Sequence, residues 1–281
     1  MRFRSLLSLL ALTGVAACGD STGSGTAQLR IQITDAPLEY FASAEVTIGE
    51  VSIIPADGAP VVVTDQGGTF DLLTLQNGVT AALGELAIEA GDYVELRLVV
   101  QSATVTLADG LTFTDGTTTR SLVVPSGAQT GIKIRLGSAD GEDDGALTIT
   151  PGETILVVDF DVSQNFVIQG AVDSPAGIQG VLFTPLLRAT VRDQAGSIAG
   201  TVTDASGPVE NATVRAVREE TDTEGTDTTA EVTAVTMEDG SYVLRFLAPG
   251  TYTVTVDGSA AAAQTVTVGE GQDVTGVDFS I

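Results

Sequence analysis

Hydrophobic and polar residues alternate along most of the chain. In QLRIQIT, residues 28–34, every second residue is a leucine or isoleucine, and the same period recurs at 45–54, 94–100 and 103–110. Such alternation is typical of strands with one buried face. Asp-Gly and Gly-Gly pairs separate the runs, and glycine supplies the backbone conformations that hairpin turns need. The pattern predicts an all-β chain with antiparallel strands.

The alternation changes in three places. LQNGVTAALGEL at 75–86 lacks β-branched alternation, which predicts one short helix or helical turn. The acidic stretch at 218–231 has no apolar residue large enough to pack, so we expect a mobile loop or a hairpin tip there. RDQAGS at 192–197 separates two sets of alternating strands. The chain therefore divides into two β domains, at 28–192 and 196–281.

The N-terminus departs from the strand pattern. Arg2 and Arg4 precede an apolar run that ends in small residues. A positive start, an apolar middle and a small-residue end are the parts of a secretory signal. The run is shorter than the ~20 residues that a membrane-spanning helix needs. We therefore assign residues 1–17 to a signal peptide.

Cys18, the only cysteine of the chain, follows this run directly. VAAC at 15–18 resembles the bacterial lipobox, in which the cysteine is acylated and the signal is cut before it. The resemblance implies a lipidated Cys18, a flexible linker over 18–27 and a membrane as partner through the lipid anchor. Gly19 rather than aspartate follows the cysteine, which favours the outer over the inner membrane in a Gram-negative host. An ordinary signal peptide with an incidental cysteine is the alternative.

Composition excludes several classes of function. The net charge of −25 becomes −27 once residues 1–17 are removed, and such a surface repels nucleic acid. The chain has no histidine, so it can hold neither a Ser-His-Asp triad nor a histidine-ligated metal. With no tryptophan and only 4 tyrosines, aromatic platforms for sugars or bases are scarce. Hydrophobic residues make up 43% of the chain, enough to fill folded cores.

Two predicted strands carry charges of opposite sign at two-residue spacing. Lys133 and Arg135 alternate with apolar residues in one strand, and Asp159 and Asp161 do so in the other. Antiparallel pairing of the two strands would set acids opposite bases, worth ~0.2–1 kcal/mol per pair. We interpret these charges as a structural ion-pair ladder, in which the bases lower the pKa of the acids.

Two alternatives for the acid pair are a cation site and a carboxylate-based glycoside hydrolase. Asp159 and Asp161 lie ~6.6 Å apart along one strand, which falls in the range of the two carboxylates of inverting glycosidases. A general acid in such an enzyme needs a raised pKa, whereas basic neighbours lower it. We therefore predict no catalytic residue and no cofactor.

Two further acidic motifs are candidates for local roles. In ADGEDDGALTITP at 139–151, Asp140, Glu142 and Asp144 follow the spacing of a calcium loop, but Pro151 stands where an EF-hand has glutamate. We keep these three acids as weak calcium candidates, with a solvated acidic hairpin loop as the alternative. Asp35 precedes Ala-Pro, and we expect its side chain to cap a turn.

The first domain resembles a bacterial domain of unknown function, DUF4382, over residues 28 to about 192. The resemblance rests on motifs in order along the chain: ITDAP at 33–37, VTIGEVSI at 46–53, FDLLTLQNGV at 70–79, LAIEAGDYVELRLVV at 86–100, VPSGAQTGIKI at 124–134, LVVDFDV at 156–162 and FTPLLRA at 183–189. The family occurs typically in lipoproteins, in agreement with Cys18. The resemblance implies no known activity.

The second domain, at 196–281, resembles the carboxypeptidase regulatory-like domain. GTVTDASGPVENATV at 200–214 and MEDGSYVLRFLAPGTYTVTV at 237–256 carry the resemblance. It implies a β-sandwich of immunoglobulin-like or transthyretin-like topology, related to carbohydrate-binding folds and used as an accessory module in secreted and surface proteins. The acidic stretch at 218–231 replaces a connection that is usually short.

Together these features predict two β-sandwich domains in tandem behind a lipoprotein signal peptide. The predicted function is a membrane-tethered, non-catalytic binding or scaffold lipoprotein of the cell envelope. Its expected partners are a carbohydrate, bound through the second sandwich by fold analogy, or an envelope protein. A glycoside hydrolase and a purely structural spacer for a partner are the alternatives.

Overall fold

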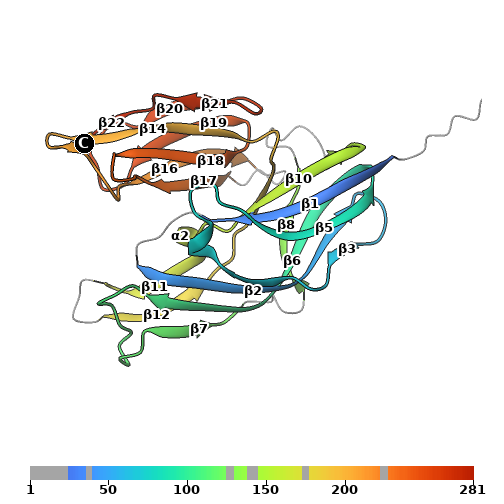
Figure 1. Cartoon of the computed structure of the whole chain (residues 1–281), viewed down its shortest axis with the longest axis horizontal. Helices are drawn as coiled ribbons and strands as arrows, with labels where there is room; N and C mark the ends of the chain where they lie inside the picture. The colour runs from blue at the N-terminus through green and yellow to red at the C-terminus, as the bar shows by residue number, and fades with distance from the viewer. Residues whose placement is uncertain (1–24, 36–39, 125–129, 138–144, 173–176, 222–226) are drawn as a thin grey trace, which may run out of the picture.

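The computed structural model describes residues 25–35, 40–124, 130–137, 145–172, 177–221 and 227–281. Cys18 and the calcium candidates Asp140, Glu142 and Asp144 lie outside these ranges. The described chain forms two tandem β domains, as predicted (Figure 1). In this part of the chain, no helix is long and apolar enough to cross a bilayer.

Two main sheets pack face to face in the N-terminal domain. The first has the order β13-β10-β1-β5, with β1 at Thr26–Thr34, β5 at Ala81–Glu89, β10 at Gly152–Asp159 and β13 at Arg188–Val191. The second has the path β3-β2-β6-β7, with β4 paired to β2 and with β8 and β9 paired to β6. Its strands are β2 at Phe41–Pro55, β3 at Val61–Thr64, β4 at Gly68–Asp71, β6 at Gly91–Leu107, β7 at Thr119–Leu122, β8 at Ile132–Arg135 and β9 at Leu147–Ile149.

Smaller elements complete this domain. β11 at Phe166–Gly170 and β12 at Ile178–Phe183 form a two-stranded sheet. The 3-10 turn η1 spans Leu72–Leu75, and the single-turn helix α2 spans Val162–Asn165.

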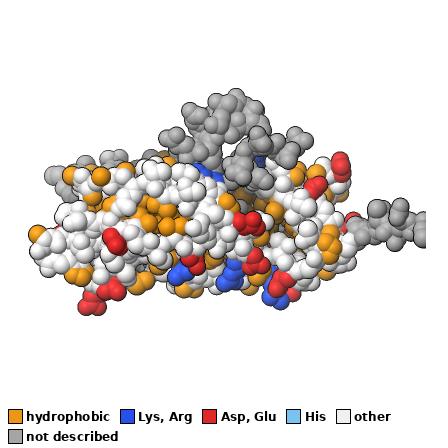
Figure 2. All heavy atoms as spheres, turned by 90° about the horizontal axis from the view of Figure 1, so that it is seen from above, with side chains coloured by type: hydrophobic (Ala, Val, Ile, Leu, Met, Phe, Trp, Pro, Cys, Tyr) orange, Lys and Arg blue, Asp and Glu red, His pale blue; other side chains and the backbone are white. Residues whose placement is uncertain are grey.

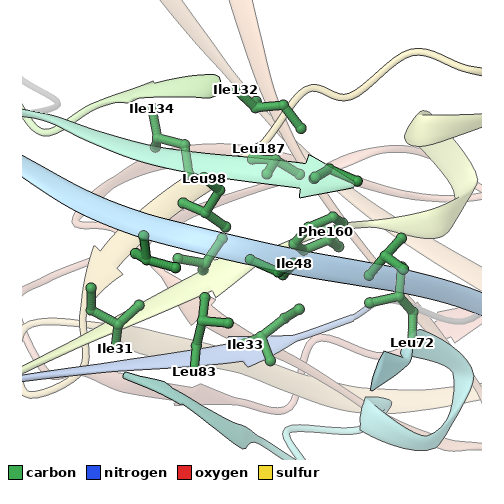
Figure 3. Packing of buried hydrophobic residues seen from close by; sticks show 14 of the residues in the cluster. Ile31, Ile33, Ile48, Leu72, Leu83, Leu98, Ile132, Ile134, Phe160 and Leu187 are labelled. Atoms are coloured by element: carbon green, nitrogen blue, oxygen red, sulfur yellow. The ribbon is translucent and has the colours of Figure 1, made fainter. Parts of the chain in front are cut away.

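The alternating apolar residues of the two main sheets form one core. Figure 3 shows Ile31 and Ile33 of β1 with Leu83 of β5 on one side, and Ile48 of β2 with Leu98 of β6 on the other. All five side chains are buried. Each such burial contributes ~1.5–3 kcal/mol, so the period-two pattern is the main source of stability in a chain without disulfides.

Three strand pairs depart from the predicted antiparallel arrangement: β1 with β10 in this domain, and two short pairings of the strand at 196–204 in the C-terminal domain. β1 and β10 pair in parallel, in a register that runs from Ala27 opposite Gly152 to Thr34 opposite Asp159. Parallel strands present their carboxyl ends at the same sheet edge. Thr34 and Asp159 therefore meet at one edge, although 125 positions separate them in the chain numbering.

The helix predicted at 75–86 is wrong. β5 begins at Ala81, and the only helical turn nearby is η1, whose start Asp71 caps by accepting a hydrogen bond from the Leu73 amide. A bulge in β5 explains the error. Gly84 pairs with Ile31 of β1 and Ala82 pairs with Gln32, so Leu83 has no pairing partner on β1. The extra residue shifts the apolar period by one, so alternation is lost in the sequence.

The predicted ladder between Lys133, Arg135, Asp159 and Asp161 is also wrong. β8 pairs with β6, where Lys133 lies opposite Arg97 and Arg135 opposite Glu95, whereas β10 lies in the other sheet. Glu95 and Arg97 of β6 show the same two-residue charge spacing as Asp159 and Asp161. The true partner thus offers only one acid and sets Lys133 opposite another base, so charge complementarity did not identify the neighbouring strand.

The C-terminal domain is a second sandwich. One sheet contains β14 at Gly196–Asp204, β15 at Gly207–Pro208, β18 at Ser241–Leu247, β21 at Asp273–Thr275 and β22 at Phe279–Ser280. The other has the order β17-β16-β19-β20, with β16 at Thr213–Thr221, β17 at Asp227–Val235, β19 at Gly250–Val256 and β20 at Gln264–Val268. The buried residues of the C-terminal domain, among them Ile198, Tyr242 and Val254, form a cluster separate from the N-terminal core.

The acidic stretch at 218–231 lies at the end of a hairpin. β16 and β17 pair from Thr213 opposite Val235 out to Thr221 opposite Asp227. The expectation of a hairpin tip is therefore confirmed, and the strand ladder extends farther into the stretch than the sequence pattern indicated.

We expect residues 25–192 and 196–281 to fold as separate fragments, because each contains a complete hydrophobic core. Each isolated fragment should give dispersed amide signals in NMR spectra. Tyr242→Ala, which removes a fully buried side chain at a cost of ~3–5 kcal/mol, should destabilise the C-terminal fragment and leave the N-terminal domain of the whole chain folded. Collapsed amide dispersion in either wild-type fragment would show that the domains depend on each other.

Candidate functional site

A small cavity lies where the two sandwiches meet. It holds about 20 Å³ and is lined by Thr34, Asp35, Asn77, Gly78 and Asp159 of the N-terminal domain and by Val232, Thr233, Ala234, Val243, Arg245 and Phe246 of the C-terminal domain. In Figure 1, β17 of the C-terminal sandwich lies close to α2 of the N-terminal one. We call this region the junction.

The parallel pairing of β1 and β10 assembles the N-terminal side of the junction. The Thr34 hydroxyl lies 3.1 Å from the carbonyl oxygen of Leu75 and 3.0 Å from that of Val79, which ties η1 and the following turn to β1. Asp35 accepts a hydrogen bond of 2.8 Å from the amide of Val162, the first residue of α2. Asp35 therefore caps a helix far along the chain, where a local turn was expected.

The chain turns sharply between β10 and α2. Asp161 is buried, has a positive φ of 35° and donates its amide to the Asp159 carboxylate at 3.2 Å. Asn165 is fully buried beneath this turn, and its side-chain amide donates to the Asp161 carbonyl at 2.9 Å. The Asn165 side-chain oxygen accepts from the Leu186 amide. These bonds hold both carboxylates at the sheet edge.

A bulge in β18 builds the C-terminal side. Leu244 pairs with Ile198 and Leu247 with Gly196, so Arg245 and Phe246 together face a single residue of β14. Phe246 has a φ of 55°, an unfavourable conformation for a bulky residue. Bulges redirect side chains, and here Arg245 and Phe246 both reach the cavity.

Gly78 permits the close approach of the two domains. Its φ is 82°, and a Cβ there would lie 2.2 Å from Cδ of Arg245. Of the four described non-glycine residues with positive φ, Asn77, Asp161 and Phe246 lie at the junction. Such conformations cost ~1–3 kcal/mol each and persist only where the surrounding contacts hold them.

Glu231 of β17 is the centre of the contacts between the domains. Its carboxylate accepts a hydrogen bond from the Gln164 side chain of α2 and forms an ion pair with Arg215 of β16. Its carbonyl oxygen accepts a hydrogen bond from Arg188 of β13. Arg215 also binds Asp257 through two nitrogens, at 3.0 and 2.7 Å. Charge-assisted bonds from both domains thus converge on one residue.

The junction changes the protonation of one of the predicted acids. Burial raises the pKa of Asp159 to about 7, the charge of Asp161 adds to the rise, and Arg188 opposes it. The prediction that basic neighbours lower this pKa is therefore wrong. Hydrogen bonding to Asp257 raises the pKa of Arg215, burial opposes the rise, and the charges of Asp257 and Asp161 add to it. The field of Asp161 therefore reaches the C-terminal domain.

The cavity is too small for substrate chemistry. A volume of about 20 Å³ admits roughly one water molecule, so a sugar ring cannot reach Asp159 or Asp161. In the part of the chain that the structure describes, no group of three or more acids, cysteines or histidines is placed to hold a metal ion. The arrangement can hold two domains together and bury one titrating carboxylate.

Asp35, Asp159 and Asp161 stand out in the sequence, and the structure brings all three to the junction. The sequence pattern does not indicate Arg188, Arg215, Glu231 and Arg245. FTPLLRA at 183–189 contains Arg188, but nothing in its sequence indicates a partner in the other domain. The bulge in β18 leaves no trace in the pattern because Phe246 reads as an ordinary strand residue.

Comparisons with known proteins identify two families. A domain of unknown function, DUF4382, matches residues 26–185, and the carboxypeptidase regulatory-like domain matches residues 197–281. Neither description names a catalytic activity, and the second is that of a regulatory-like module. No curated protein matches the chain.

Solved structures show only distant similarity. The TIE protein of Bacillus anthracis is 13% identical, with 91% of this chain and 34% of that protein covered at a TM-score of 0.21. A streptococcal ancillary pilin is 14% identical, with coverages of 92% and 63% and a TM-score of 0.24. The shaft pilin SpaA from Lactobacillus rhamnosus GG is 12% identical, with coverages of 91% and 96% and a TM-score of 0.24.

The chain thus spans about a third of the first of these structures and less than two thirds of the second. At TM-scores this low, the similarity carries no functional argument. The family models are the informative match, because the first covers more than half of the sequence. The protein belongs to the DUF4382 family and carries a carboxypeptidase regulatory-like domain after the family domain.

Proposed function

We propose that the protein is a membrane-tethered, non-catalytic scaffold or binding lipoprotein of the cell envelope, in which the junction fixes the two sandwiches relative to each other. The observation that carries this proposal is the convergence of Gln164, Arg188 and Arg215 on Glu231. The Glu231 side chain is only 17% exposed, so solvent screens these bonds less than it would screen surface pairs.

The tether rests on the sequence around Cys18. Each buried CH₂ of an acyl chain contributes ~0.8 kcal/mol to membrane binding, and two or more chains anchor stably. The predicted linker over 18–27 is two residues too long, because β1 begins at Thr26; we expect the segment between Cys18 and β1 to act as a flexible tether. Such a linker would hold the folded domains close to the lipid surface, and the order of the chain would place the C-terminal sandwich farther from the anchor.

Partners of this scaffold are a carbohydrate or an envelope protein. The resemblance of the C-terminal domain to carbohydrate-binding folds supports the first. On the face that Figure 2 shows, acidic and basic side chains stand close together along one edge, and hydrophobic side chains gather in a separate patch. Such a mixed surface suits contacts with several classes of neutral ligand better than binding to a polyanion.

A glycoside hydrolase is the second candidate, and one observation favours it. Asp159 has a raised pKa and lies beside Asp161, as in an acid–base pair. Against it, the cavity holds about 20 Å³ and both domains enclose it. The raised pKa then reports burial at a contact between domains, and we prefer the scaffold.

Cys18→Ser should release the protein from the membrane fraction of its host, because the hydroxyl cannot take the place of the acylated thiol. Membrane and soluble fractions are compared by immunoblot, with Ser21→Ala as a control variant that keeps the cysteine. If wild type and Cys18→Ser distribute alike between the fractions, the lipid anchor is refuted.

Glu231→Ala should loosen the junction, because the variant leaves Gln164 without its carboxylate partner and Arg215 with Asp257 alone. A loss on the order of 1–3 kcal/mol is expected for a partly buried charged hydrogen-bond acceptor. Proteolysis in the connection at 192–195 should become correspondingly faster. Glu238→Ala, which changes an exposed glutamate in the turn between β17 and β18, should have no effect. Equal cleavage rates for both variants would contradict a fixed junction.

Asp159→Asn should remove a pH dependence of stability. Because its folded-state pKa is raised to about 7, Asp159 contributes stability that is fully present below its unfolded pKa of about 3.9 and is lost as the pH rises through 7. The contribution is at most ~4 kcal/mol, at about 1.4 kcal/mol per pH unit. In denaturant titrations, the free energy of unfolding of the variant relative to that of wild type should increase from pH 5 to pH 8.

Asp239→Asn is the matched control for this titration. Hydrogen bonds from Ser241 lower the pKa of Asp239, which is the opposite direction. The free energy of unfolding of Asp239→Asn relative to wild type should therefore not increase above pH 5. If Asp159→Asn is less stable than wild type at pH 8, Asp159 is ionised and held by its basic neighbours.

A further inference from the structure

We propose that a polar groove on the outer face of the N-terminal domain binds a neutral carbohydrate. The groove has a volume of about 310 Å³ and crosses β2 where the turn between β3 and β4 folds over it. Its lining includes Thr47, Gly49, Asp65, Gln66, Thr69 and Gln101. In the view of Figure 1, β2 and β3 lie on the far side of β1 and β10 from the C-terminal sandwich.

Two irregularities of the β2–β6 ladder open the groove. Thr47 pairs with Ser102 and Ile48 pairs with Val100, so Gln101 bulges out of β6. The next paired residues are Val51 and Leu98. Gly49 and Glu50 of β2 therefore lie opposite a single residue of β6, so β2 is irregular as well. Consecutive bulges of this kind re-aim side chains and are frequent beside binding sites.

Glycines form the floor of the groove. Gly67 donates its amide to the Gly49 carbonyl at 2.9 Å, and a Cβ on Gly67 would lie 2.2 Å from the Ile48 carbonyl oxygen. A Cβ on Gly49 would lie 2.3 Å from Nε2 of Gln101. The β3–β4 turn and the Gln101 amide can therefore rest directly on the β2 backbone, and no side chain fills the space between them.

The walls offer hydrogen-bonding groups that the protein leaves available. Within the described chain, the side chains of Asp65, Gln66 and Gln101 make no hydrogen bond, and all three are exposed. The hydroxyls of Thr47 and Thr69 form a hydrogen bond of 2.9 Å with each other at one end, which leaves one hydroxyl hydrogen and the remaining lone pairs for a ligand. Two amides, two hydroxyls and one carboxylate provide both donors and acceptors, which is what the hydroxyls of a sugar require.

The lining also selects against other ligands. It contains one acid and neither lysine nor arginine, so an anion would find no counter-charge. An extended peptide would need an open strand edge, but β3 and β4 pair along one side of β2 and β6 along the other. The ring of Phe70 lies beside the groove, 3.4 Å from a Cβ placed on Gly68. The volume lies at the lower end of the ~300–1,000 Å³ of ligand sites, which suits a short saccharide unit.

The test is a titration of the full-length, detergent-solubilised protein followed by amide NMR. The probes are maltotriose, cellotriose and the trimer of N-acetylglucosamine, with trigalacturonate as the charged counterpart. At least one neutral trimer should shift the amide signals of residues 47–49, 66–69 and 101 saturably, and trigalacturonate should not. Gln66→Ala combined with Gln101→Ala should weaken that binding about tenfold or more, since two hydrogen bonds are lost.

Thr106→Ala combined with Thr119→Ala is the matched control. These residues form the same kind of hydroxyl pair, 3.1 Å apart, on the same sheet outside the groove. Binding should be unchanged in this variant. The proposal is overturned if no neutral trimer shifts the groove signals, if the glutamine variant binds as wild type, or if the shifts fall in residues 196–281. The last result would assign the saccharide to the C-terminal sandwich and leave the membrane tether unaffected.

Discussion

The parallel pairing of β1 with β10 is the constraint on which the rest of the structure depends. It places the carboxyl ends of two strands at one edge, so that Thr34 stands opposite Asp159. Asp35 can then reach the Val162 amide and begin α2, and α2 in turn presents Gln164 to Glu231 of the second domain. An antiparallel pair would send one of these ends to the opposite edge, and the C-terminal sandwich would have no acidic rim to meet.

The junction is polar because of what such an edge offers. Strand ends expose backbone groups and turn residues, and the surrounding residues must satisfy them. Burial of Asp159 favours its protonated form, the charge of Arg188 opposes this only in part, and the Arg188 side chain donates to the Glu231 carbonyl. A contact of this kind adds little hydrophobic stability, but it accepts only one arrangement of partners. The main effect of the junction is therefore to fix the relative orientation of the two domains.

Alternation in the sequence predicted which residues face the cores, and Ile31, Ile33, Ile48 and Leu98 are buried as expected. Both domain families could be identified from local motifs for the same reason, since strands and turns are encoded locally. Pairing is not: the charges of β8 are complementary to Asp159 and Asp161, yet β8 pairs with β6, where Lys133 lies opposite the like charge of Arg97. Asp159 and Asp161 were recognised as special, but their environment is set by Arg188, Glu231 and a second domain that no short motif describes.

Irregular pairing explains why the remaining features escaped prediction. A bulge at Leu83 hid a strand, a bulge at Gln101 opens the outer groove, and a third aims Arg245 and Phe246 at the junction. Hydrophobic residues alternate with a period of two only where each residue of a strand has one partner on the neighbouring strand. A bulge therefore interrupts the alternation at its own position. The same extra residue frees a side chain from the ladder to reach something else. In this fold, the positions that the pattern fails to predict are therefore the ones best placed to contact a ligand or another domain.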